Sequence, residues 1–242
     1  MSATSLDILA IAAHRDDVEQ TCGGTLLKAA QGARRTGILD LTQGEMGTRG
    51  SAEDRAREAA DAAKILGAGW RRALDIPDGR VENTWENRLK VASVIRETRP
   101  RVVILPYWKG RHPDHYTCSL LGYEACFLAG LAKLALGSPP LAPHRPFKII
   151  YATLYYDVRP TFVVDISAQF EQKFASILAY KSQFNDQEAG KEIFPAQAEI
   201  RSRVESMARY YGALGGVTYA EPFLQKEVGL VEDLMAIPVK SI

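Results

Sequence analysis

The sequence predicts an α/β protein with a Rossmann-like, mainly parallel sheet and helices on both faces. Short strand-like apolar runs alternate with longer helical patterns along most of the 242 residues. The chain is 46% hydrophobic, which is enough for one good core and fits a single domain over residues 1–242. In such a fold, the loops at the carboxyl ends of the strands carry the functional site.

The strands are predicted from short apolar or β-branched runs. The first run is apolar almost throughout and indicates a buried strand. The third is short and leads into the turn signal Pro77-Asp78-Gly79. In order along the chain, the expected strands cover residues 6–13, 35–41, 73–76, 102–105, 148–156 and 161–166.

The helices are predicted from longer stretches with their own start and stop signals. Residues 53–66 are rich in Ala, Arg and Glu and stop at Gly67, whereas residues 86–98 are amphipathic and end before Pro100. The pair Gly23-Gly24 opens an earlier helix. The remaining helices are expected at 116–136, at 168–184 and at about 197–211. The Pro-rich stretch 137–146 requires no domain boundary.

Composition argues against several classes of function. Lys and Arg number 30 against 29 Asp and Glu, so charge does not indicate nucleic acid or an acidic membrane as a partner. No apolar run approaches the roughly 20 residues of a membrane span, and the first residues lack a signal-type pattern. The 3 cysteines have no metal or redox spacing and indicate buried thiols. We therefore expect a cytoplasmic enzyme.

Two His/Asp clusters follow two of the predicted strands. His14-Arg15-Asp16-Asp17 comes directly after the strand at 6–13, and His112-Pro113-Asp114-His115 comes shortly after the strand at 102–105. Neighbouring parallel strands bring such clusters to one edge of a sheet. Imidazole and carboxylate suit zinc, and three ligands leave a position open for water. The residues alone leave His112 as an alternative to His115 among the ligands.

Together the two clusters resemble those of the zinc-dependent de-N-acetylases of the PIG-L/LmbE type. The resemblance implies His14, Asp17 and His115 as the metal ligands, with Zn²⁺ as the cofactor; such sites also accept other divalent metals such as Fe²⁺. Arg15 stands where the family usually has Pro. That position lies between the functional residues, so we expect the chemistry to be unchanged.

The resemblance also implies roles for the remaining residues of both clusters. Asp16 is expected to act as general base toward the water and to deliver the proton to the leaving amine; a helix cap is the structural alternative. A protonated His112 would stabilise the oxyanion. Asp114 would keep His112 charged and oriented.

Further motifs resemble those of the bacillithiol-biosynthesis branch, whose enzymes deacetylate N-acetylglucosaminyl-malate. This resemblance runs from about residue 6 to residue 226. It implies Arg49 and Arg111 as partners of the malate carboxylates, and Arg55 and Asp78 as partners of sugar hydroxyls. The motifs lie at 40–45, 47–51, 58–60 with 65–68, 106–107 with 111–115, 162–166 and 180–184. Residues expected to close the pocket, without individual roles, are Tyr155, Tyr156 and Arg159.

Two alternatives to this function stay open. One is a de-N-acetylase of another N-acetyl sugar, such as N-acetylglucosamine or a chitin oligomer, because loops set the specificity of such sites. The other is a nucleotide- or cofactor-binding Rossmann protein, which the absence of a GxGxxG pattern after the first strand disfavours. The expected partner is a small N-acetyl sugar conjugate, and we expect a homo-oligomer.

Overall fold

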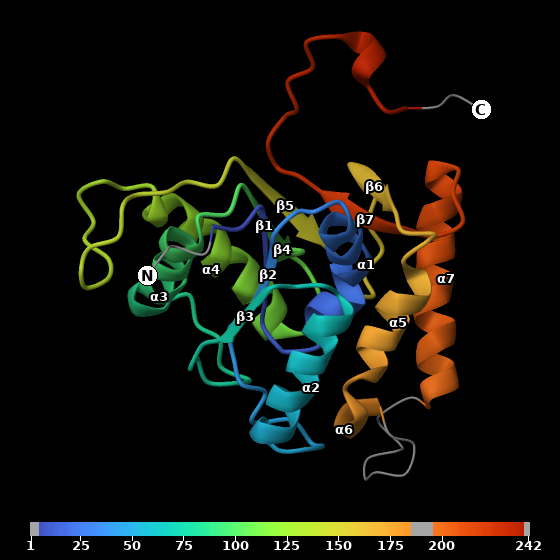
Figure 1. The fold of residues 1–242 in the computed structure, drawn as a ribbon, viewed down its shortest axis with the longest axis horizontal. Helices are drawn as coiled ribbons and strands as arrows, with labels where there is room; N and C mark the ends of the chain where they lie inside the picture. The colour runs from blue at the N-terminus through green and yellow to red at the C-terminus, as the bar shows by residue number, and fades with distance from the viewer. Residues whose placement is uncertain (1–4, 185–195, 240–242) are drawn as a thin grey trace.

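The computed structural model describes residues 5–184 and 196–239, and seven strands within them form one sheet (Figure 1). The strands are β1 (Ile8–Ala12), β2 (Thr36–Asp40), β3 (Trp70–Ala73), β4 (Val102–Pro106), β5 (Lys148–Ala152), β6 (Phe162–Asp165) and β7 (Ala220–Leu224). The helices are α1 (Asp17–Gln31), α2 (Ala52–Ile65), α3 (Trp85–Thr98), α4 (Pro113–Ala129), α5 (Phe170–Leu178), α6 (Lys181–Phe184) and α7 (Gln197–Gly215). A 3₁₀ turn, η1, follows at Leu234–Ala236.

The sheet is parallel except at one end, so the predicted fold class is confirmed. Its strand order is β3-β2-β1-β4-β5-β7-β6. β1 lies between β2 and β4 and pairs in parallel with both. β7 runs antiparallel to β5 and β6. Because β1 and β4 are parallel neighbours, the loops that follow them meet at one edge of the sheet.

Helices cover both faces of the sheet, as predicted (Figure 1). α3 and α4 pack on one face, around a core that includes Leu9, Leu39 and Val103. α1 packs on the opposite face, against Ala10 and Ile104, and α5 packs in turn on α1 and α2. Since successive residues of a strand point to opposite faces, both cores draw on the same strands.

β7 was missing from the predicted strands, and Pro222 in its middle is the reason. A proline cannot donate to a strand ladder and counts against a strand in the interior of a sheet. In the structure, β5 pairs only with Phe223 and Leu224, so Pro222 lies just beyond that ladder. On its other side, Pro222 is in register with Val163 of β6.

α1 begins at Asp17 and is kinked at Cys22, so the predicted start at Gly23 marks its second segment. Glu221 of β7 explains the kink. Its carboxylate accepts hydrogen bonds from the backbone N–H groups of Gly24 (2.9 Å) and Thr25 (2.7 Å). Those donors are thereby withdrawn from the continuous helical ladder, which is a recognised cause of a break. Lys173 of α5 neutralises the buried carboxylate at 2.6 Å.

Two other helix predictions differ from the structure. α4 starts at Pro113, where proline is favoured as the first helical residue, and His112 is its N-cap. The helix predicted at 168–184 is divided into α5 and α6. Across the described ranges, no helix is both long and apolar enough to cross a bilayer.

Candidate metal centre and active site

The two His/Asp clusters meet at the carboxyl ends of β1 and β4. His14 follows β1 and His115 lies in the first turn of α4, 101 positions apart in the sequence, yet their ring nitrogens Nδ1 and Nε2 are 3.2 Å apart. Asp17, at the start of α1, lies with them: its carboxylate is 3.4 Å from His14 Nδ1 and 3.2 Å from His115 Nε2.

These spacings fit a divalent metal. Two ligand atoms bound at about 2.0–2.1 Å in a tetrahedron lie about 3.3–3.4 Å apart, which is close to all three distances among His14, Asp17 and His115. The ligand atoms of these residues lie within 4.8 Å of one another. His14, His112 and Asp114 form a second possible group. Both Asp114 oxygens already accept backbone N–H groups, from Gly79 and Val81, so the first group fits better.

Two carboxylates hold the other ring nitrogen of His14. Asp78 Oδ1 lies 3.0 Å and Asp114 Oδ2 lies 3.3 Å from His14 Nε2. A carboxylate on the second nitrogen fixes the ring and leaves the first nitrogen as the ligand. Burial lowers the pKa of His14, but Asp17, Asp114 and Asp78 outweigh it and raise that pKa to about 12. The same negative surroundings favour a bound cation.

These contacts engage two aspartates for which the sequence implied other partners. Asp78 was expected to bind sugar hydroxyls, but its oxygens are engaged by His14 and by the backbone N–H of Met46 at 3.0 Å. Asp114 was expected to orient His112, but its carboxylate contacts His14 instead. Both aspartates therefore position a candidate ligand, because the 77–81 loop lies against the end of β1.

His112 was expected to be protonated, and its environment points to the neutral form. Its Nδ1 accepts the backbone N–H of Asp114 at 3.2 Å, as the N-cap of α4. Burial and the neighbouring His14 and His115 lower the pKa of His112. A neutral ring with Nδ1 as acceptor keeps its proton on Nε2. His112 also lines the pocket beside His115, so this N–H is available as a neutral hydrogen-bond donor.

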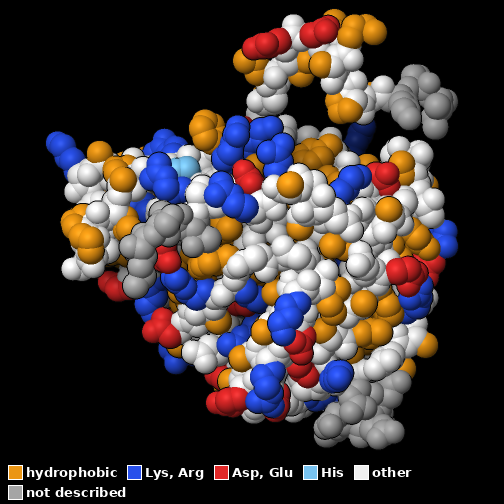
Figure 2. Space-filling model, viewed as in Figure 1, with side chains coloured by type: hydrophobic (Ala, Val, Ile, Leu, Met, Phe, Trp, Pro, Cys, Tyr) orange, Lys and Arg blue, Asp and Glu red, His pale blue; other side chains and the backbone are white. Residues whose placement is uncertain are grey.

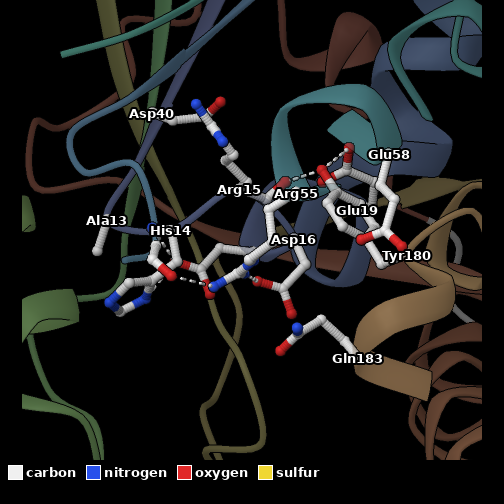
Figure 3. A network of polar contacts seen from close by, with 12 residues as sticks. Ala13, His14, Arg15, Asp16, Glu19, Asp40, Arg55, Glu58, Tyr180 and Gln183 are labelled. Carbon is white, nitrogen blue, oxygen red and sulfur yellow. Dashed lines mark hydrogen bonds and ion pairs between the residues drawn. The ribbon is translucent and has the colours of Figure 1, made fainter. Parts of the chain in front are cut away.

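Asp16 follows His14 by two positions, and Figure 3 shows it beside Arg55. Two side chains hold its carboxylate. Arg55 of α2 donates to its Oδ1 at 2.7 Å, and Gln20 donates to its Oδ2 at 3.2 Å. Arg55 was expected to bind sugar hydroxyls. The structure buries it beneath Asp16 instead, where it fixes a carboxylate that is still partly exposed.

The backbone between His14 and Asp17 rests on residues that the sequence did not indicate as site residues. Arg71 of β3 and the Tyr180 hydroxyl both donate to the carbonyl oxygen of Arg15. Arg71 also pairs with Asp40 at 2.8 Å and with Glu19 at 2.6 Å. Burial raises the pKa of Glu19 to about 7 despite this pairing. Figure 3 labels Arg15, Glu19, Asp40 and Tyr180 of this network near His14 and Asp16.

The two arginines expected to bind carboxylates lie in different surroundings. Arg49 is only 4% exposed, and its Nη1 donates to the Gln183 carbonyl of α6 at 3.0 Å; its carboxylate-binding role stays a prediction. Arg111 is exposed and lines a pocket of about 150 Å³ that includes Asp17, His112 and His115. Tyr155 lies on the same pocket, and its hydroxyl donates to Gln20 at 3.2 Å. Tyr156 and Arg159 are exposed.

Comparison with known proteins decides the family. The model of the PIG-L family, described as GlcNAc-PI de-N-acetylase, matches residues 9–126. The diacetylchitobiose deacetylase of Thermococcus kodakarensis is 33% identical over 225 residues, which cover 88% of this chain and 80% of that protein. The chain belongs to the PIG-L family.

Solved structures agree with membership of the PIG-L family. The conserved protein TT1542 of Thermus thermophilus is 41% identical, with a TM-score of 0.84 over 94% of this chain and 98% of that one. The N,N'-diacetylchitobiose deacetylase of Pyrococcus horikoshii is 25% identical, with a TM-score of 0.79 over 92% of this chain and 83% of that one. Membership of this family agrees with the resemblance that the two His/Asp clusters bear to PIG-L/LmbE de-N-acetylases.

Proposed function

We propose that this protein is a metal-dependent hydrolase that removes the acetyl group from an N-acetylglucosaminyl conjugate. The observation that carries the proposal is the group of His14, Asp17 and His115 at metal-ligand spacing, with a further carboxylate, Asp16, next to it. Family membership supports de-N-acetylation of an N-acetylated sugar as the reaction.

Zinc is the first candidate for the metal, because two imidazoles and one carboxylate suit it, and iron(II) fits the same donors. A divalent ion supplies Lewis acidity, which polarises a carbonyl and acidifies a neighbouring water. The protein's part is to fix the donors. Asp78 and Asp114 hold His14 with Nδ1 directed at Asp17 and His115.

Asp16 and His112 divide the proton chemistry and the charge stabilisation. Asp16 takes the proton from the attacking water and later gives it to the departing amine, so that amide and water become acetate and free amine. Arg55 and Gln20 hold the Asp16 carboxylate in one orientation for both transfers. The Nε2–H of His112 donates to the carbonyl oxygen as negative charge develops on it.

The proposed substrate is N-acetylglucosaminyl-malate, as the bacillithiol-branch motifs imply. Support comes from the pocket, because the exposed cations Arg111 and Lys109 line it beside His112 and offer charge to a carboxylate. Diacetylchitobiose is the second candidate, because a relative that is 33% identical is a diacetylchitobiose deacetylase. One domain over residues 1–242 and a cytoplasmic location stay predictions from the sequence.

Metal analysis of histidine variants tests the ligand assignment. His14→Ala and His115→Ala should each lose most of the metal while keeping the fold. His144→Ala is the matched control, because His144 lies away from the site, with its Nε2 2.7 Å from the Pro100 carbonyl. Full metal content in both site variants would contradict the assignment.

A free-amine assay on N-acetylglucosaminyl-malate, diacetylchitobiose and N-acetylglucosamine tests the substrate. Loss of one charge-assisted hydrogen bond, about 1.5–3 kcal/mol, should reduce kcat/KM roughly 10–150-fold. Arg111→Ala should show this loss on the malate conjugate only. Arg34→Ala, an exposed arginine just before β2, is the control. Preference for diacetylchitobiose in the parent enzyme would favour the second candidate.

A further inference from the structure

The carboxyl-terminal arm, residues 227–239, projects from the body (Figure 1), and the space-filling view shows apolar side chains along it (Figure 2). Val228 is 98%, Leu234 80% and Met235 89% exposed. The arm has local order, because Asp233 caps η1 by accepting the backbone N–H of Met235 at 2.9 Å. Apolar groups gathered on an ordered segment and exposed to water mark an interaction site.

Lys226, the residue before the arm, holds the base of the arm against the body. The Nζ of Lys226 lies 4.5 Å, 4.9 Å and 5.0 Å from the ring centroids of Tyr123, Tyr151 and Trp108. Such cation–π contacts hold an ammonium in place. The chain therefore leaves the body at a defined point, and the arm beyond it is available for contact with another surface.

A largely apolar groove of about 800 Å³ lies between α4, β5 and the first residues of the arm, 227–230. Phe127 and Phe147 line it and are 56% and 78% exposed. Along α4, the apolar side chains of Tyr116, Leu120 and Tyr123 continue from Phe127 at helical spacing. The groove and this stripe form one apolar face.

The arm and the groove have complementary charges. The arm carries Glu227, Glu232 and Asp233 and has no Lys or Arg. Arg88 and Glu124 also line the groove and pair with each other at 2.8 Å. Three further cations border it: Arg145, 4.6 Å over Phe127, Lys148, and Arg101, 5.6 Å over Phe147. None of these three cations forms an ion pair with a carboxylate in residues 5–184 or 196–239.

We propose that the arm of one copy of this chain docks in the α4–β5 groove of a second copy. In its own copy, residues 228–230 border the groove, whereas Leu234 and Met235 stand clear of the body. The nine residues from Val231 to Val239 can span up to about 30 Å, enough to reach a neighbouring molecule. Because each chain carries both the arm and the groove, two copies can exchange arms reciprocally.

The oligomeric state of the full chain tests the proposal. By light scattering after size exclusion, the parent protein should form an oligomer. Leu234→Asp in the arm and Phe147→Asp in the groove should each raise the Kd of assembly roughly tenfold or more. Leu214→Asp is the matched control, because this exposed leucine lies on α7. Circular dichroism of each variant checks that it is folded.

Mixing the two variants separates exchange between copies from an arm that folds back on its own groove. The Leu234→Asp chain keeps an intact groove, and the Phe147→Asp chain keeps an intact arm. Their mixture should therefore recover one arm–groove contact per pair and assemble better than either variant alone. A monomeric parent, unchanged assembly of Leu234→Asp, or a mixture no better than its components would each overturn the proposal.

Discussion

Replacing Asp78 with Asn should weaken metal binding about tenfold. The change preserves the size of the side chain but removes the charge that lies 3.0 Å from His14 Nε2. Loss of a partner behind a metal-binding histidine costs roughly 10–100-fold in affinity. We expect the smaller loss of affinity in this range, because Asp114 still contacts His14 Nε2 at 3.3 Å. Asp78→Asn combined with Asp114→Asn should therefore approach the upper end.

The assay is a competition titration against a chelating dye, followed by KM measured at saturating metal. Asp75→Asn is the matched control, because Asp75 is an exposed aspartate on the same segment and pairs with Lys90. If Asp78 positions His14, the variant loses metal affinity and keeps its KM for the sugar. A raised KM with unchanged metal affinity would refute this reasoning and restore the sugar-binding role that the sequence implied.

Three further results are expected. Asp16→Asn should keep the metal and lose roughly 10²–10⁴ in kcat; parent-like turnover would exclude it as the base. Apparent metal affinity should rise at least about tenfold per pH unit near neutrality, because His14, whose pKa its carboxylate neighbours raise to about 12, must release a proton to bind, and Asp17 raises the pKa of His115 too; a pH-independent titration would contradict this. Gly212→Ala should cost about 1–3 kcal/mol by overpacking, since its Cβ would lie 2.7 Å from the Thr218 carbonyl oxygen, whereas Gly69→Ala, with no atom within 4 Å, should leave the Tm unchanged.

The order of the strands alone could predict that the two His/Asp clusters meet, whereas the choice of His14, Asp17 and His115 as ligands came from the family resemblance. His14 and Asp17 directly follow one strand, and His115 lies shortly after another. Parallel pairing of β1 and β4 then brings them together. The general position of the site at the carboxyl edge of the sheet needed no knowledge of side-chain packing.

The surroundings of those ligands could not be predicted, because they depend on how loops and helices pack. Asp78 reaches His14 from the loop after β3, and Arg55 reaches Asp16 from α2. A sequence motif does not distinguish an arginine that faces a ligand from one buried under a carboxylate. Arg49 shows the same difficulty, because its contact with Gln183 depends on where α6 packs.

The kink in α1 connects the antiparallel end of the sheet to the candidate metal site. Asp17 begins the short segment before Cys22, and the second segment begins where Glu221 of β7 takes up the N–H groups of Gly24 and Thr25. The direction of the turn that carries Asp17 is thus set in part by a strand about 200 positions later. A fragment ending before β7 would retain both His/Asp clusters but lose this control. Grafting the clusters into another scaffold would require a replacement for Glu221.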